Sequence, residues 1–115
     1  MGISKIEVIT SQNKLSALKI TLAGMGVSGI TAIQGLGCGV QHGTQEYEVE
    51  VHDQMELLPK QYIMILVEDE KVEKVTDLIM KELYSGHIGD GKIVITPVSK
   101  VIRIRTGEEG TAALS

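Results

Sequence analysis

A glycine-rich stretch that ends in a lysine is the part of this sequence best suited to chemistry. Residues 85–92 read Ser-Gly-His-Ile-Gly-Asp-Gly-Lys. Glycine has no Cβ and adopts positive φ angles readily, so backbone N–H groups in such a turn can approach a ligand together. Lys92 adds a point charge suited to phosphate. The stretch predicts a phosphate-binding loop, although a glycine-rich connection without a ligand explains the turn alone equally well.

Two arginines follow soon afterwards, in the segment Arg-Ile-Arg-Thr-Gly-Glu at residues 103–108. If this segment is extended, Arg103 and Arg105 point to the same face, because side chains alternate along a strand. Guanidinium groups bind phosphate oxygens through paired, charge-assisted hydrogen bonds. We therefore interpret the glycine stretch and the arginine segment as two halves of one phosphate-binding site.

The glycine stretch differs from the P-loop of ATP-hydrolysing enzymes. The spacing from Gly86 to Gly91 and Lys92 fits that motif, but Ile93 stands where a metal-binding Ser or Thr belongs. The order of elements is also reversed, because a P-loop runs from strand into helix and this stretch follows an amphipathic helical pattern. No pairing of a nucleophile with a base stands out elsewhere. We expect a protein that is not an enzyme, in which slow ATP hydrolysis would be incidental.

Composition and charge narrow the class of protein. The 115 residues are expected to form one domain with an aliphatic core, because there is no Trp, no Phe and only three Tyr. A net charge of −4 argues against nucleic acid as the main partner, and no apolar stretch reaches the ~20 residues that span a bilayer. Cys38 is the single cysteine, so no internal disulfide can form and a reducing cytoplasm is the expected location.

Hydrophobic periodicity predicts an α+β fold with the order βαββαβ. Strands are expected at residues 5–10, 27–37, 62–67 and 92–96, the third of them central and bounded by Pro59. Helices are expected at residues 15–25, with Asn13 as N-cap and Gly24 and Gly26 closing the helix, and at residues 69–84. This order is the ferredoxin-like arrangement, an antiparallel sheet with both helices on one face.

The connection between the second and third strands, residues 38–58, is long for so small a domain and suggests a functional arm. It has no Lys or Arg, and alternation over residues 47–51 allows a hairpin extension. Its five acidic residues are Glu46, Glu48, Glu50, Asp53 and Glu56. Such a segment suits a partner with a positive surface. A solvated acidic loop without a partner is the alternative interpretation. A metal site is a less favoured interpretation than either, because nothing in the sequence fixes the geometry of the ligands.

Four segments together resemble the PII nitrogen-regulatory signal proteins. They are Gly37-x-Gly39-x-Gln41, Leu58-Pro59-Lys60, Ile88-Gly89-Asp90-Gly91-Lys92-Ile93 and Arg103-Ile104-Arg105-Thr106-Gly107-Glu108. The resemblance covers the whole chain and implies a homotrimer of ferredoxin-like subunits, with ATP or ADP in the three clefts between them. Residues 38–58 would be the T-loop that docks onto a target transporter or enzyme. Residues 85–92 would be the B-loop around the phosphates, and residues 101–115 a C-terminal segment.

The resemblance also implies which residues bind ligands. Those that serve the nucleotide from one subunit would be Gly37, Gln41, Gly89, Asp90, Gly91 and Lys92. Arg103 and Arg105 would reach it from the next subunit, and Thr31 would contact the adenine. A 2-oxoglutarate molecule would be held by Gln41 and Lys60, and Gln41 would bind Mg²⁺ only with ATP and 2-oxoglutarate both present.

Several positions depart from the family pattern. Asp53 stands where the family has its modified tyrosine, which excludes uridylylation there, and Val49 replaces the arginine that plugs ammonium channels. Val40 replaces a basic residue that touches phosphate. Ser11 replaces a basic residue of the 2-oxoglutarate site, and His42 replaces a lysine. These departures make 2-oxoglutarate and the usual channel partner less secure expectations than the nucleotide.

The expected function is regulation, by a protein that senses ATP against ADP and signals through its arm. The alternative from the same fold is a small-ligand module of the amino-acid-binding type without a nucleotide. The phosphate cluster separates the two, because an amino acid does not need Lys92, Arg103 and Arg105 together.

Overall fold

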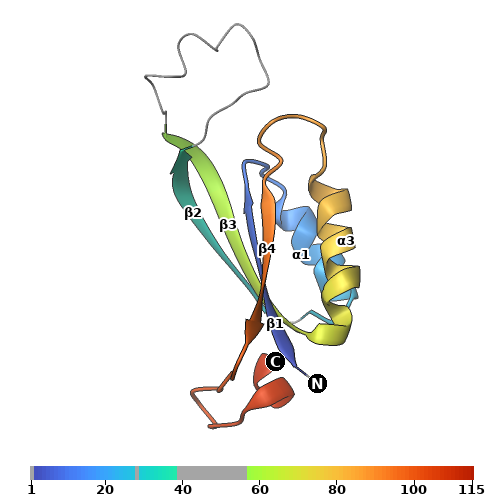
Figure 1. Cartoon of the computed structure of the whole chain (residues 1–115), viewed down its shortest axis with the longest axis vertical. Coiled ribbons are helices and arrows are strands. Elements are labelled where there is room, and N and C mark those ends of the chain that lie inside the picture. The colour runs from blue at the N-terminus through green and yellow to red at the C-terminus, as the bar shows by residue number, and fades with distance from the viewer. Residues whose placement is uncertain (1, 28, 39–56) are drawn as a thin grey trace, which may run out of the picture.

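The computed structural model describes residues 2–27, 29–38 and 57–115, and they form one sheet with two α-helices (Figure 1). The strands are β1 (Ile3–Thr10), β2 (Ile30–Cys38), β3 (Leu57–Glu68) and β4 (Lys92–Val98). The α-helices are α1 (Leu15–Gly24) and α3 (Val72–Leu83), and short 3-10 helices are η2 (Asp69–Lys71) and η3 (Gly110–Leu114).

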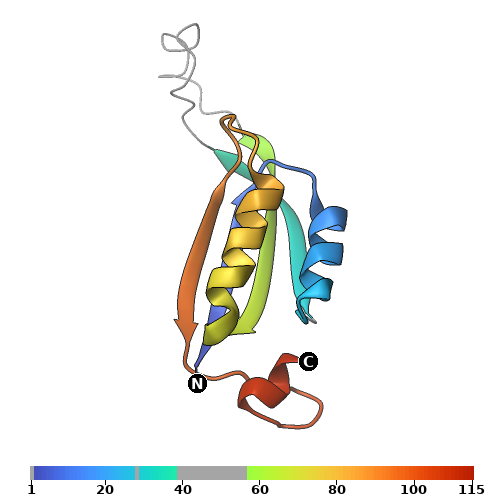
Figure 2. The same cartoon turned by 90° about the vertical axis from the view of Figure 1, so that its right-hand side faces the viewer.

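The sheet order is β2-β3-β1-β4, and every neighbouring pair is antiparallel. Both α-helices cover the same face of the sheet, and no described helix or strand lies over the other, bare face (Figures 1 and 2). This is the ferredoxin-like βαββαβ fold expected from the sequence. The order places β2 and β4 at opposite edges, with β1 and β3 between them.

The core lies between the sheet and the two helices, and it is aliphatic as expected. On β1, Ile6 and Val8 are buried because alternate side chains of a strand point to the helical face. The helices contribute residues three or four apart, which share one face of a helix. The buried cluster is Ile6, Val8, Leu18, Leu22, Val27, Ile63, Ile65, Val67, Val75, Ile79 and Leu83. Each such side chain stabilises the fold by about 1.5–3 kcal/mol relative to exposure.

The start of α1 differs from the prediction. Lys14, rather than Asn13, is the N-cap residue, and no side chain caps the helix. The Asn13 side chain instead accepts a hydrogen bond from Gln61 Nε2 at 3.0 Å, so a contact with β3 replaces the local one. The end of the helix was predicted correctly. Gly26 has φ +83°, and the N–H groups of Gly26 and Val27 donate to the last turn, which is a Schellman motif.

The third strand is longer than predicted, because Pro59 lies inside β3 rather than before it. Pro59 is opposite Leu36 of β2. On the other side β3 pairs with β1 only from Gln61 onward, where Gln61 is opposite Thr10. Proline has no N–H to donate, and at this position β3 has a neighbour on one side only. The pairing of β2 with β3 therefore continues past Pro59 to its last pair, Cys38 opposite Leu57.

Candidate functional site

The glycine stretch forms the loop that joins α3 to β4, as the sequence predicted. Gly86, Gly89 and Gly91 have φ angles of +82°, +106° and +104°, a region that favours glycine strongly. Gly91 is further constrained by packing, because a Cβ there would overlap the Ile9 carbonyl oxygen and come within 2.8 Å of Thr10 Cα. The loop (residues 85–91) therefore needs glycine for its conformation and for its close approach to β1.

Asp90 holds this loop together from inside. Its Oδ2 atom accepts hydrogen bonds from the N–H groups of Ser85 at 2.8 Å and Gly86 at 3.0 Å. Its Oδ1 atom accepts from the Ser85 hydroxyl and from Gln12 Nε2 at 3.1 Å. The hydrogen bond from the Ser85 hydroxyl, followed by that from the Ser85 N–H, lowers the pKa of Asp90 below its ordinary value. Asp90 is therefore an anion that organises the loop.

The Asp90 contacts divide the loop into two halves. The N–H groups of Ser85 and Gly86 are occupied by the carboxylate. The His87 N–H donates to the Ser85 hydroxyl at 3.2 Å. The N–H groups that remain outside this network belong to residues 88–91, directly before Lys92. An anionic ligand would therefore meet the second half of the loop, while the first half supports it.

The base of the arm lies beside this loop. Gly37 of β2 packs on Lys60 of β3 so closely that a Cβ would lie 2.6 Å from Lys60 Cγ. Lys60 Nζ donates to the Ser11 hydroxyl at 2.8 Å, and the Ser11 N–H donates to the Gly89 carbonyl at 3.0 Å. The structure thus brings Gly37, Lys60 and Gly89 together, although they are far apart in the sequence. Gln41 lies outside the described residues.

Lys92 and Thr31 project from the bare face of the sheet. Lys92 is opposite Ile9, whose side chain is exposed, and Thr31 is opposite Met64. The two predicted site residues lie on strands at opposite edges of the sheet. Three strand spacings separate these edges, which is roughly 14 Å. Within one chain, Thr31 is therefore not part of the cluster around the glycine loop.

The arginine segment lies at the other end of the molecule. β4 starts at Lys92, beside the glycine loop, and ends at Val98, so the strand alone separates the two ends by roughly 20 Å. Figures 1 and 2 show the chain after β4 at the end of the sheet opposite the α3–β4 loop. Within one chain, Arg103 and Arg105 do not meet the loop.

The expectation of an extended arginine segment is wrong. The Arg103 N–H donates to the Glu108 carbonyl at 2.8 Å, and the Gly107 N–H donates to the Arg103 carbonyl at 2.7 Å. Gly107 has φ +75°, so this glycine reverses the chain, and Ile102 forms a bridge with Glu109. The two guanidinium groups therefore do not share the face of a strand.

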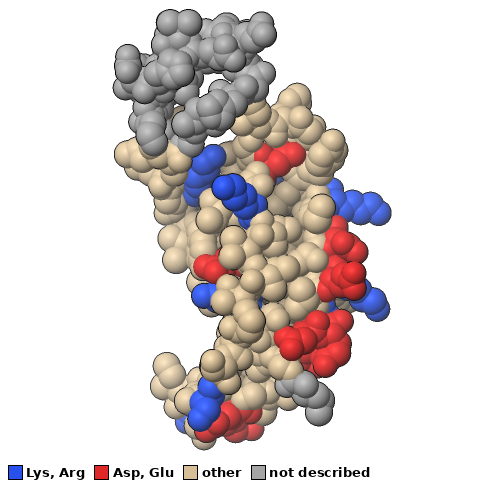
Figure 3. All heavy atoms as spheres, in the orientation of Figure 1, with Lys and Arg blue, Asp and Glu red and all other residues tan. Residues whose placement is uncertain are grey.

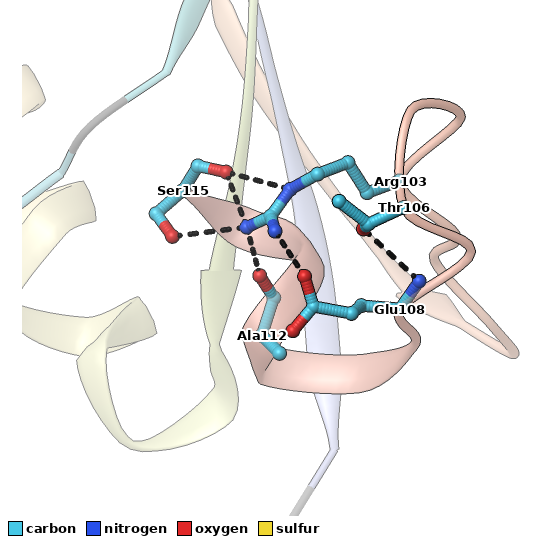
Figure 4. Close-up of polar contacts among 5 residues, drawn as sticks. All are labelled: Arg103, Thr106, Glu108, Ala112 and Ser115. Atoms are coloured by element: carbon cyan, nitrogen blue, oxygen red, sulfur yellow. Dashed lines mark hydrogen bonds and ion pairs between the residues drawn. The ribbon is translucent and has the colours of Figure 1, made fainter.

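Arg103 is occupied by its own chain. Its Nη1 forms an ion pair with Glu108, and its Nη2 donates to the carbonyl groups of Ala112 and Ser115 (Figure 4). Its Nε also donates to the Ser115 carbonyl, at 3.2 Å. Arg105 is exposed at the turn and has no hydrogen bond or ion pair among the described residues. The two arginines thus differ, since Arg103 holds the end of the chain and Arg105 is open to a ligand.

Sequence reasoning missed Gln12 and Ser85. Gln12 donates to Asp90 Oδ1, across 78 positions of sequence, and to the Ser85 hydroxyl at 3.4 Å. A signal was present for Ser85, because short polar side chains often bond to backbone groups of a neighbouring turn. No comparable signal marks Gln12, since its contact depends on the sheet that places β1 beside β4.

Lys60 and Lys92 lie on the same face of the sheet as Tyr62 and Ile9. Figure 3 shows basic side chains close together near the end of the sheet from which the arm departs, and acidic side chains along the side of α3. Among residues 2–27, 29–38 and 57–115, no group of three His, Cys, Asp or Glu side chains is placed to hold a metal ion. In the same part of the chain, no helix is long and apolar enough to cross a membrane.

The described residues thus form a small ferredoxin-like domain with an internally braced glycine loop and a lysine directly after it. The family model described as nitrogen regulatory protein P-II matches residues 3–108. The chain therefore belongs to the P-II family of nitrogen regulatory signal proteins.

The individual similarities extend over nearly the full length. The chain is 41% identical over 110 residues to a nitrogen regulatory protein P-II of Azospirillum brasilense, covering 96% of this chain and 98% of that one. It is 40% identical to the nitrogen regulatory protein P-II 1 of Escherichia coli K12, again covering 96% of this chain and 98% of that one. A solved GlnK–ATP complex of B. subtilis matches with a TM-score of 0.83 and 32% identity, over 98% of this chain and 96% of that one. Arabidopsis thaliana PII bound to citrate matches with a TM-score of 0.78 and 30% identity, over 99% and 91%.

Proposed function

We propose that this protein binds ATP and ADP in clefts between the subunits of a homotrimer, senses the energy state of the cell, and signals to a target protein through residues 38–58. The observation that supports this most is the glycine loop. Asp90 braces its first half, and the N–H groups of residues 88–91 precede Lys92. Backbone N–H groups and an ammonium group are complementary to phosphate oxygens. A structurally similar GlnK was solved with ATP.

The homotrimer is supported by the bare face of the sheet. Ile33, Tyr62 and Ile9 lie opposite one another on β2, β3 and β1, which places their side chains in one row. Ile33 and Ile9 are exposed by 57% and 42%, and Val94 of β4 by 43%. Exposed aliphatic side chains on three strands of one sheet face favour association with further copies.

The distribution of the predicted site residues points to the same assembly. The loop is at one end of the sheet, directly before the edge strand β4. Thr31 is on the opposite edge strand, β2, and Arg105 is at the opposite end of the sheet. A neighbouring copy can bring both to the loop. The nucleotide would then lie between the loop of one subunit and Arg105 of the next, with Thr31 near the adenine. In this arrangement Arg103 positions the segment that carries Arg105, and it contacts the nucleotide only if the Glu108 and Ser115 contacts are released.

A second ligand is supported less directly. Lys60 lies at the base of the arm with its ammonium group bonded to a hydroxyl, and an anionic ligand could replace that partner. Citrate, a carboxylate, is bound to the similar Arabidopsis PII. In the proposal, 2-oxoglutarate would use Lys60 and Gln41, and Mg²⁺ would be bound by Gln41 only with ATP and 2-oxoglutarate present. A cytoplasmic location and a target with a positive contact surface remain predictions from the sequence.

Calorimetry on the purified chain tests the nucleotide site. ATP and ADP should bind to the wild-type protein, and Lys92→Met should weaken both by roughly 10- to 100-fold, because a charge-assisted contact to phosphate is lost. Lys74→Met is the matched control, since Lys74 is an exposed lysine in the first turn of α3, at the end of the helix away from the loop. Absence of nucleotide binding to the wild-type protein, or equal affinities in the two variants, would reject the proposed site.

A further inference from the structure

Two residues directly after β1, Ser11 and Gln12, lie between the glycine loop and the base of the arm. The Ser11 N–H donates to the Gly89 carbonyl at 3.0 Å, and a Cβ on Gly89 would lie 3.1 Å from the Ser11 hydroxyl oxygen. The Ser11 hydroxyl in turn accepts from Lys60 Nζ at 2.8 Å. Ser11 thus contacts the loop through its backbone and the arm's base through its side chain.

Gln12 contacts the same loop at a second point. Its Nε2 atom donates to Asp90 Oδ1 at 3.1 Å and to the Ser85 hydroxyl at 3.4 Å. These are the two side chains that brace the first half of the loop. The backbone N–H of Gln12 donates to the hydroxyl of Thr10 at 3.0 Å, and Thr10 is only 1% exposed. Gln12 is therefore attached through its backbone to the buried end of β1 and through its side chain to Asp90.

We propose that Ser11 and Gln12 are positioning residues that set the phosphate-binding conformation of the loop and connect it to Lys60. The proposal rests on the proposed nucleotide function. Lys60 acts through the Ser11 hydroxyl in the nucleotide-bound protein without 2-oxoglutarate, rather than by touching the phosphates. Ligand binding at the loop is then coupled to the β2–β3 ladder at the base of the arm, because Lys60 packs on Gly37.

Substitutions of Gln12 test the first contact. Gln12→Ala removes the donor to Asp90, and ATP affinity should fall roughly 3- to 10-fold, the effect of one hydrogen bond. Gln12→Glu keeps the size but places a second carboxylate against Asp90, and the loss should be larger. Ser16→Ala, an exposed site on α1, should leave the affinity unchanged. Wild-type affinity in both Gln12 variants would overturn the proposal for this residue.

A double-mutant cycle tests the connection to Lys60. Ser11→Ala and Lys60→Met should each weaken ATP binding roughly 3- to 10-fold, and the double variant should be no weaker than either single one, because both break the same hydrogen bond. Ser11→Thr keeps the hydroxyl and should restore affinity. If the two effects multiply, Lys60 contacts the nucleotide independently of Ser11 and the proposed connection is wrong. Wild-type affinity in both single variants would overturn it as well.

A measurement without ligand separates this inference from the proposed function. Amide hydrogen exchange of Ser85 and Gly86 reports the Asp90 brace directly, and protection should fall several-fold in Gln12→Ala but not in Ser16→Ala. If the wild-type protein bound no nucleotide, the proposed function would fail while faster exchange still supported the positioning role. Unchanged exchange in Gln12→Ala would overturn that role, whatever the nucleotide affinity.

Discussion

Replacing Arg105 by alanine is expected to weaken ATP and ADP binding without changing the stability of the subunit. Arg105 is exposed and has no partner among the described residues, so its removal leaves no buried group unpaired. Loss of a charge-assisted hydrogen bond to phosphate costs roughly 1.5–3 kcal/mol, which raises the Kd by about 10- to 150-fold. Calorimetry gives the affinity, and thermal denaturation should give a wild-type Tm.

Arg103→Ala is the informative comparison. Arg103 holds Glu108, Ala112 and Ser115, so its loss should release the end of the chain and shift the Arg105 turn. The affinity falls in this variant too, but together with a lower Tm or faster exchange after residue 108. If Arg103→Ala leaves the nucleotide affinity unchanged, and also the Tm and the exchange after residue 108, the contacts in Figure 4 have no role in presenting Arg105.

Mixed trimers decide whether Arg105 acts on the neighbouring subunit. Arg105→Ala subunits keep the loop, and Lys92→Met subunits keep Arg105. On random mixing, about three in four trimers contain both kinds, and each of these has one cleft in which an intact loop meets an intact Arg105. About a quarter of all clefts should then regain wild-type affinity. No recovery on mixing, with trimers confirmed by light scattering, would refute the placement of the site between subunits.

Three further predictions follow from the loop and the arm. Gly91→Ala should destabilise the protein by roughly 2 kcal/mol or more in urea denaturation, because the new Cβ would overlap β1 and because φ at this position is +104°. Gly24→Ala is the control, since there is open space around Gly24, and it should be neutral or slightly stabilising. Asp90 has a lowered pKa, so its brace stabilises the loop above the ordinary carboxyl pKa of 3.8 and is lost as the pH falls through the folded-state value. The side-chain carboxyl chemical shift of Asp90 should therefore be constant from about pH 7 to 5 and change only below about pH 4. Replacing Glu46, Glu48 and Glu50 by glutamine should abolish the salt-sensitive binding of a target with a positive surface and leave nucleotide affinity intact; equal binding of that target would contradict the acidic-arm hypothesis.

The fold was predictable because its signals are local and repeated. Val75 and Ile79 follow a helical face and Ile63 and Ile65 follow a strand, and both pairs are buried as expected. The exceptions depend on neighbours that a local pattern does not show. Asn13 contacts β3 instead of capping α1, and Pro59 is tolerated in β3 because β1 has already ended.

The candidate site was predictable in part. The loop of residues 85–91 was identified from glycine spacing, which reflects a backbone requirement of the chain itself. The arginine segment was misjudged, because alternation was given more weight than Gly107, which reverses the chain. The brace from Gln12 to Asp90 joins residues 78 positions apart, and only the packing of β1 beside β4 brings them together.

The separation of the loop from Arg105 has a consequence for assembly. If each cleft uses the loop of one subunit and Arg105 of the next, the nucleotide binds the trimer and not the isolated chain. A ligand that binds only the assembled form stabilises it by RT ln(1 + [L]/Kd), which is about 2.7 kcal/mol at 100 times the Kd. The same linkage requires that tighter assembly raise nucleotide affinity by the equivalent factor. In that case the row of Ile33, Tyr62 and Ile9, in which Ile33 and Ile9 are exposed, would influence nucleotide affinity through assembly, although these side chains lie on the sheet face and not in the loop.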